Sequence, residues 1–300
     1  MTDAAREWAE RIGPMGIWSF DIERMTAKDA AELARATESL GFRTLWIPES
    51  LGSKEIFAHA GILLAATRRL VIASGIANIW ARDPVAMANG ARALSDAYPD
   101  RFLLGLGVSH APSVQTRGGK YARPVEHMRS YLAAMDEAPY TGPKIEIPRV
   151  LAALGPRMLR LAGERALGAH PYFVPVEHTT LAREALGARP LLASEQAIVL
   201  TQDPDAARQA ARRHMKRYLD LENYANNLRR LGWAETDLAE GGSDKLVDAI
   251  VAWGDDAAIK ARVREHHRRG ADHVCLQVLR PDPKAPPGPD LERAARALLS

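Results

Sequence analysis

The sequence predicts an α/β fold, specifically a (β/α)8 TIM barrel with a helical insertion after the seventh strand. Short apolar runs, typical of strands buried on both faces, alternate along the chain with segments of helical periodicity. Most connections between these runs are too long for hairpins, which favours parallel strands joined by helices. The 300 residues fall within the range of α/β barrels, so we expect a single domain over residues 1–300.

Eight runs are expected to be strands because they are short, apolar and bounded by turn residues. The first follows Gly13-Pro14, and the second ends before Pro48-Glu49-Ser50. The predicted strands are Met15–Phe20, Thr44–Ile47, Leu70–Ala73, Phe102–Leu106, Val150–Leu154, Ala169–Phe173, Ala193–Leu200 and His273–Val278.

Helices are expected between these strands, at segments with start or stop signals. Gly41 follows the predicted helix Ala27–Leu40, and glycine is favoured just after a helix C-terminus. Asp83 can cap a later helix, and Pro84 suits its first position, where a missing N–H costs nothing. The other predicted helices are Ile56–Thr67, Pro124–Met135, Pro156–Glu164, Thr179–Leu186, Asp256–Arg269 and Leu291–Leu299.

Some segments depart from this alternation. Ala111–Arg123 is expected to be a polar loop, Ala138–Pro148 an irregular link, and Pro281–Pro289 a surface connection rich in proline. The longest departure is the insertion at about residues 204–253, which we expect to shape the substrate mouth. Its predicted helices are Pro204–Leu219, Asn223–Leu231 and Asp244–Trp253.

Composition and charge narrow the class of protein. The 40 Lys and Arg against 37 Asp and Glu leave a net charge of +3, which is too even to indicate a nucleic-acid partner. The single cysteine, Cys275, excludes an internal disulfide framework and fits a reducing cytosol. The first residues contain acidic side chains and no apolar core, so no signal peptide is expected. No apolar stretch approaches the roughly 20 residues that cross a bilayer. We therefore expect a cytoplasmic protein without a membrane partner.

The loops that follow the strands of a barrel build its active site. Small and polar residues gather in two such loops, after the third and the fourth predicted strands. They are Gly75, Ile76, Ala77 and Asn78 in the first loop, and Gly107, Ser109 and His110 in the second. A histidine in this place can serve as acid or base near neutral pH, or it can merely pack or cap the loop. Glu49, which follows the second strand, is a carboxylate that could pair with His110 across the barrel mouth.

The turn Gly155-Pro156-Arg157-Met158 is a candidate anion site. Pro156 can occupy the first helical turn, so the free N–H groups beyond it would point off a helix end that attracts phosphate. Arg157 would add a full charge. By spacing alone, a routine strand-to-helix turn is the more common interpretation.

Three further features contain residue types that can form sites. The sixth predicted strand ends in, or is followed by, His170, Tyr172 and Phe173. These side chains either line a ligand site or belong to the core and the rim of the barrel. Glu195 lies in the seventh strand, where a buried carboxylate needs a partner. No metal site is expected, because Glu265-His266-His267 lies on a helix whose consecutive residues point about 100° apart.

Four segments of the chain, in this order, resemble the bacterial-luciferase-like monooxygenase superfamily, and most closely its branch of oxidoreductases that use the deazaflavin coenzyme F420. The resemblance runs from about Met15 to Leu279. The segments are SGIANIWARDPVAMA, DRFLLGLGVSHAP, RVLAALGPRMLRLAGERALGAHPY and RGADHVCLQVL.

The resemblance implies an enzyme that moves a hydride between F420 and a small organic substrate, with His110 or Glu49 handling the proton. It implies a cis peptide bond at Gly75–Ile76 against the coenzyme ring, and it places the Asn78 amide near the pyrimidine edge. The turn Gly155 to Met158 would hold the ribityl-phosphate tail, while Trp80 and Arg82 would cover the ring or simply pack the loop. Related glucose-6-phosphate dehydrogenases carry His after strand two and Glu after strand four. Here the two types are exchanged, which puts sugar-phosphate oxidation in doubt.

Other functions stay open at this point. The same fold with FMN and molecular oxygen would be a monooxygenase, and the residue spacing does not separate the two cofactors. A non-catalytic F420 carrier or sensor is a hypothesis of another class. A Schiff-base lyase is disfavoured, because none of the predicted strands ends in lysine. Luciferase-like proteins are commonly dimers, so a homodimer is an expectation of the resemblance alone.

Overall fold

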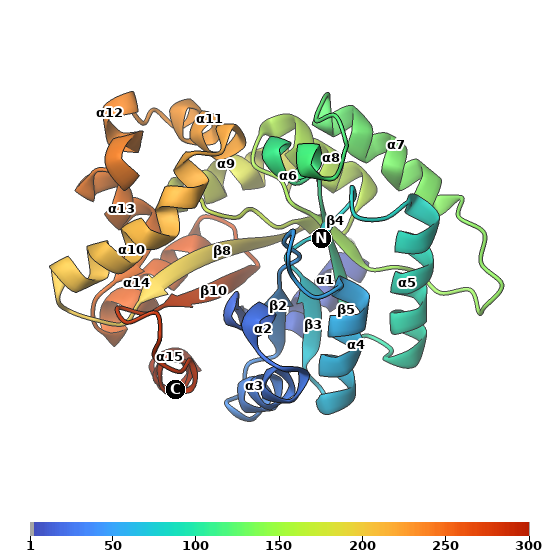
Figure 1. Ribbon diagram of the computed structural model, residues 1–300, viewed down its shortest axis with the longest axis horizontal. Helices are drawn as coiled ribbons and strands as arrows, with labels where there is room; N and C mark the ends of the chain where they lie inside the picture. The colour runs from blue at the N-terminus through green and yellow to red at the C-terminus, as the bar shows by residue number, and fades with distance from the viewer. Residues whose placement is uncertain (1–2, 300) are drawn as a thin grey trace.

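The strands of the protein are short, apolar and buried, as expected for a sheet covered on both faces. Every residue of β2 (Thr44–Ile47), β3 (Val71–Ser74), β5 (Phe102–Gly107) and β8 (Leu191–Val199) is buried. The computed structural model, which describes residues 3–299, arranges them with their neighbours as a parallel barrel (Figure 1). The other barrel strands are β1 (Met15–Trp18), β6 (Arg149–Leu151), β7 (Gly168–Ala169) and β10 (His273–Leu279).

The pairing of β10 with both β1 and β8 closes the barrel. The hydrogen-bonded order is β10, β1, β2, β3, β5, β6, β7 and β8, and β8 pairs in turn with β10. Two short strands lie beside this ring: β4 (Ala77–Asn78) pairs with β5, and β9 (Val251–Trp253) pairs with β8. The predicted (β/α)8 TIM barrel is confirmed.

Helices lie around the strands and begin at the signals that the sequence carries. The Asp83 side chain accepts hydrogen bonds from the backbone N–H groups of Val85 and Ala86, with Pro84 in the first turn. Asp203 caps α10 in the same way. The helices are α1 (Asp3–Ile12), α2 (Asp21–Arg24), α3 (Ala27–Ser39), α4 (Ile56–Ala66), α5 (Pro84–Ala97), α6 (Ala111–Thr116), α7 (Pro124–Asp136), α8 (Pro156–Arg165), α9 (Val176–Leu186), α10 (Pro204–Leu219), α11 (Glu222–Arg230), α12 (Glu235–Leu238), α13 (Asp244–Ile250), α14 (Asp256–Arg268) and α15 (Gly288–Leu299), with a 3-10 turn at Ala239–Gly241.

The insertion after β8 holds α10, α11, α12 and α13, but it ends in a strand. The sequence predicts one helix over Asp244–Trp253, whereas α13 ends at Ile250 and the last three residues form β9. The two-residue strand β7 pairs with only the first part of β8, at Leu191 and Leu192. The rest of that edge is therefore available, and β9 pairs with it at Ala197–Val199.

Two other local predictions are wrong. The segment Ala111–Arg123 is not entirely a polar loop, because α6 forms in its first half around the fully buried Val114. Of the sixth predicted strand, Ala169–Phe173, only Ala169 is in a strand, since β7 spans Gly168–Ala169. Pro171 has no N–H to donate to a ladder, and Phe173 adopts a positive φ of 56°.

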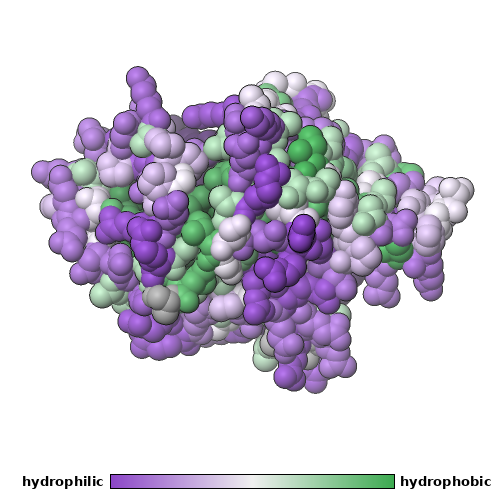
Figure 2. All heavy atoms as spheres, turned by 90° about the horizontal axis from the view of Figure 1, so that it is seen from below, coloured by the Kyte–Doolittle hydropathy of each residue, from purple (hydrophilic) through white to green (hydrophobic). Residues whose placement is uncertain are grey.

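The core has two parts, one inside the barrel and one between the barrel and its helices. Side chains alternate along each strand, so Trp46 belongs to the interior cluster, whereas Leu45 and Ile47 pack outward. Trp8 and Ile12 of α1, a helix that the sequence reasoning missed, join the interior cluster. Much of the face seen in Figure 2 is hydrophilic, and apolar residues show there as an oblique strip left of centre and as smaller groups to its right. Among the helices described, none is long and apolar enough to cross a bilayer.

Candidate active site

A cleft of about 800 Å³ opens at the carboxyl ends of the barrel strands. The segments that follow β1, β2, β3, β5, β6 and β7 line it from the barrel, and α10 and α11 line it from the insertion. Ala77 is the predicted site residue that lies behind the cleft, fully buried and paired with β5. The predicted site residues that line the cleft are Glu49, Gly75, Ile76, Asn78, Gly107, Ser109, His110, Gly155, Pro156, Arg157, Met158 and Tyr172.

The bulge after β3 fits closely against β5. The Gly75–Ile76 peptide bond is cis, so this expectation is confirmed. A Cβ atom at Gly107 would collide with the Ile76 side chain, and one at Gly75 would collide with the Trp18 indole. Glycine at these two positions therefore lets the bulge sit at the cleft floor.

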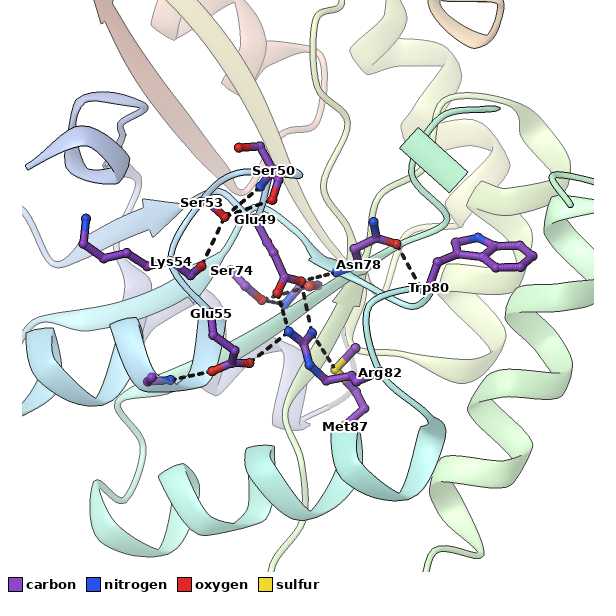
Figure 3. Close-up of polar contacts among 12 residues, drawn as sticks. Glu49, Ser50, Ser53, Lys54, Glu55, Ser74, Asn78, Trp80, Arg82 and Met87 are labelled. Atoms are coloured by element: carbon purple, nitrogen blue, oxygen red, sulfur yellow. Dashed lines mark hydrogen bonds and ion pairs between the residues drawn. The ribbon is translucent and has the colours of Figure 1, made fainter. Parts of the chain in front are cut away.

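Asn78 links this bulge to the loop that follows. Its side-chain oxygen accepts a hydrogen bond of 2.9 Å from the backbone N–H of Trp80. Its side-chain NH2 group is turned away from Trp80 (Figure 3) and remains a donor for a ligand in the cleft. Trp80 stacks on His127, with ring centroids 4.3 Å apart, which is the packing role considered from the sequence.

Glu49 is bound to Arg82 rather than to His110 (Figure 3). Arg82 donates to both carboxylate oxygens, one of them at 3.0 Å, and the backbone N–H of Asn78 donates to the carboxylate at 2.7 Å. The side chains of Glu49 and Arg82 are only 5% and 11% exposed, and Arg82 also pairs with Glu55. Within residues 3–299 no ion pair joins Glu49 to His110. Glu49 and Arg82 thus hold the loop in place.

His110 bonds to the insertion. Its Nδ1 lies 3.1 Å from the side-chain oxygen of Asn223, at the start of α11. Since an amide oxygen accepts only, Nδ1 carries the proton and Nε2 is left with a lone pair. Burial lowers the pKa of His110, the charge of Arg217 lowers it further, and the hydrogen bond to Asn223 opposes them. The imidazole is therefore neutral at neutral pH and can accept a proton.

The turn before α8 has the form of an anion site. Gly155 is the N-cap of this helix, and no side chain caps its N–H groups. A Cβ atom at Gly155 would lie 3.6 Å from the nearest guanidinium nitrogen of Arg230 on α11. Arg157, the cation expected here, is 66% exposed and pairs with Glu126. Arg230 therefore brings a guanidinium beside the turn, whereas the charge of Arg157 is paired at the surface.

The cleft floor holds buried polar groups. The Tyr172 hydroxyl donates to Gln277 at 2.7 Å and lies 2.9 Å from the Tyr218 hydroxyl, and burial raises the pKa of both phenols. Trp18 Nε1 and His170 Nε2 have no hydrogen-bond partner within the described part of the chain, although both residues line the cleft. One is a donor and the other an acceptor, and both atoms are buried beneath the cleft surface.

Sequence reasoning missed the residues that the insertion contributes. Their signal was weak, because charged and polar residues on helices usually face solvent. Across the described chain, no group of three or more His, Cys, Asp or Glu side chains is arranged to hold a metal. The missed residues that line the cleft include Arg217, Tyr218, Asn223, Tyr224 and Arg230.

Two relatives in sequence carry names linked to methanopterin or F420. A 5,10-methylenetetrahydromethanopterin reductase of Methanolobus tindarius is 24% identical over 152 residues, covering 45% of this chain and 47% of that protein. The alignment thus spans about half of that relative's length. A Mycobacterium tuberculosis protein, provisionally named a coenzyme F420-dependent oxidoreductase, is 26% identical over 291 residues, which covers 75% of this chain and 83% of that one.

Solved structures share the barrel. An F420-dependent secondary alcohol dehydrogenase in complex with an F420–acetone adduct superposes with a TM-score of 0.77 at 17% identity, covering 95% of this chain and 98% of that chain. The FMN-bound oxygenating constituent of a 3,6-diketocamphane monooxygenase from Pseudomonas putida gives 0.67 at 16% identity, with 95% and 97% covered. At these identities the likeness shows the fold alone. A family model described as luciferase-like monooxygenase matches residues 9–273, so the chain belongs to the luciferase-like monooxygenase family.

Proposed function

We propose that the protein is an oxidoreductase that transfers a hydride between coenzyme F420 and a small organic substrate. One observation carries the proposal: a single cleft combines a helix N-terminus that no side chain caps with a buried histidine whose Nδ1 bonds to Asn223, which leaves Nε2 to take a proton. A phosphate-bearing redox coenzyme and a proton acceptor are what such a transfer needs. The names of one relative in sequence and one solved structure cite F420, and they favour this coenzyme.

The residues of the cleft fit a coenzyme of this kind. The ring would lie over Gly75 to Asn78 and beside Gly107, with the Asn78 amide as a donor to its edge. The phosphate would meet the N–H groups at the start of α8 and the guanidinium of Arg230. When bound, the coenzyme supplies the carbon that gives or accepts the hydride.

The protein's own contribution is to orient the substrate, exclude water and move the proton. His110 Nε2 is the atom we assign to the proton, since Asn223 holds the other ring nitrogen. Glu49, the other predicted acid or base, has its carboxylate occupied by Arg82 and the Asn78 backbone. We therefore assign Glu49 to positioning the loop.

A titration of the purified protein with F420, followed by coenzyme fluorescence and run in parallel with FMN, tests the proposal. Saturable F420 binding at micromolar or lower concentration, with weaker FMN binding, is the expected result. Tight binding of FMN alone, with oxygen consumption by the reduced flavin, would instead support a monooxygenase. The likeness to an FMN-bound monooxygenase keeps this second candidate in view. F420 binding without turnover of any substrate or acceptor would indicate a carrier or sensor.

A further inference from the structure

Arg217 on α10 lines the cleft without a counter-charge. Its guanidinium carbon lies 4.9 Å from the ring centroid of Phe20 and 5.1 Å from that of Tyr218. The two aromatic rings support the cation, because their faces attract positive charge. We propose that Arg217 binds a carboxylate or phosphate group of the substrate, so that the protein acts on small organic anions. This inference rests on the proposed function, because it concerns the substrate of the same cleft.

Arg217 differs from the other arginines of its helix. Arg208 pairs with Asp248, Arg212 pairs with Asp244, and Arg213 donates to the backbone carbonyls of the segment after β10. Within residues 3–299, Arg217 forms neither a hydrogen bond nor an ion pair. Its donors are therefore available to a ligand.

The carboxylates near this part of the cleft are engaged elsewhere. Glu49, the carboxylate that lines the cleft, is bound to Arg82. Glu23, which follows β1, accepts hydrogen bonds from the backbone N–H and the hydroxyl of Ser50. Neither carboxylate forms an ion pair with Arg217 within residues 3–299, so its guanidinium can still bind an anion that enters the cleft.

Arg217 and Arg230 have different neighbours in the cleft. Arg230 stands beside Gly155 at the start of α8, where we place the coenzyme phosphate. The guanidinium of Arg217 lies over the Phe20 ring, and its positive charge lowers the pKa of His110. Tyr224 lies with its ring 5.4 Å from that of His110. An acid held by Arg217 would therefore have its reacting carbon near the proton acceptor.

Calorimetric titration with malonate and with inorganic phosphate tests the anion site. Wild-type protein should bind at least one of these probes, and malonamide, the neutral counterpart of malonate, should bind at least about tenfold more weakly than malonate. Arg217→Gln should lose about tenfold or more in affinity. Lys216→Gln is the matched control, because it removes the same charge from the adjacent position, which faces a different pocket. Inorganic phosphate can also bind at the start of α8, so Arg230→Gln is tested with malonate, whose affinity it should retain within about twofold.

The outcomes separate this inference from the proposed function. Equal probe affinity of wild type and Arg217→Gln, equal affinity for malonate and malonamide, or no probe binding by the wild type would overturn it. A tenfold loss of F420 affinity in Arg217→Gln, with probe binding unchanged, would assign Arg217 to the coenzyme and leave the proposed function standing. If the protein binds no F420 but binds the probe in a way that depends on Arg217, the anion site is supported and the proposed function is contradicted.

Discussion

The side-chain oxygen of Asn223 lies 3.1 Å from Nδ1 of His110, although 113 positions separate the two residues in the chain. One residue follows a barrel strand and the other opens a helix of the insertion. Because the Asn223 oxygen accepts the Nδ1 proton, the imidazole of His110 is the tautomer whose Nε2 carries a lone pair. The chemistry assigned to His110 therefore depends on both parts of the molecule.

His110→Ala should lower the turnover number by about two to four orders of magnitude, because general acid–base catalysis contributes about that much. The dissociation constant of the coenzyme should stay within about twofold. Steady-state kinetics and a coenzyme titration check the two expectations. His127→Ala is the control, since His127 stacks on Trp80 outside the residues that line the cleft. Wild-type turnover in His110→Ala would remove this residue from the mechanism.

The pH dependence of kcat/KM should show an acidic limb with a midpoint below about 6.5, the ordinary pKa of histidine. Burial lowers the pKa of His110, and a proton acceptor works only when it is unprotonated. Activity should therefore rise with pH through this lowered pKa. Asn223→Ala removes the contact that raises this pKa, so the limb should move to still lower pH. A midpoint of the acidic limb well above pH 6.5, or one that Asn223→Ala moves to higher pH, would contradict the assignment of His110 as the proton acceptor.

Arg230→Gln should weaken F420 binding by about tenfold, as expected for one charge-assisted contact to a phosphate. Arg229→Gln, the adjacent change, should have little effect, because Arg229 pairs with Glu235 on the surface. Fluorescence titrations of both variants measure the difference. Equal affinities would show that the start of α8 does not bind the phosphate with help from Arg230.

Glu49→Gln should lower the free energy of unfolding by about 3 kcal/mol, because it leaves a buried arginine without its main partner. Glu10→Gln breaks the Arg6–Glu10 pair, whose side chains are 71% and 68% exposed, and should cost less than about 1 kcal/mol. Urea unfolding of both variants checks this. A small effect of Glu49→Gln would mean that the pair does little to hold the loop.

Glu195→Gln should change how stability depends on pH. Burial raises the pKa of Glu195 to about 8, above the value of about 4.3 for an unfolded chain. The contribution of this carboxyl to stability is therefore complete below about pH 4.3 and is lost as the pH rises through about 8. The melting temperature of Glu195→Gln should improve relative to wild type between pH 6 and pH 9. A difference that does not vary with pH over this range would contradict the raised pKa.

The features predicted correctly from sequence are those with local causes. Asp83 and Pro84 start α5 through contacts within a few residues, and the apolar run Thr44–Ile47 is β2 to the residue. The error at β9 has a distant cause, since this strand forms only because β8 extends beyond β7. No local pattern in Val251–Trp253 reports that partner.

The residues of the candidate site likewise fall into those with local signals, which the sequence predicts, and those placed by distant contacts, which it does not. The residues that follow the strands, such as His110, were found because a parallel barrel places all these ends at one mouth. Arg217 and Arg230 were missed because both lie on polar helices, and the face that covers the cleft is decided by tertiary packing. The pairing of Glu49 with Arg82 was missed for a related reason: a carboxylate's partner is set by the path of the loop.

The insertion delivers its share of the cleft from one short stretch of chain, residues 217–230, which includes Arg217, Asn223, Tyr224 and Arg230. The insertion begins directly after β8 and ends in β9, which pairs with β8, so the insertion as a whole is joined to the barrel at both of its ends. The residues that the insertion adds to the cleft can therefore be replaced within this short stretch while every barrel strand is left unchanged.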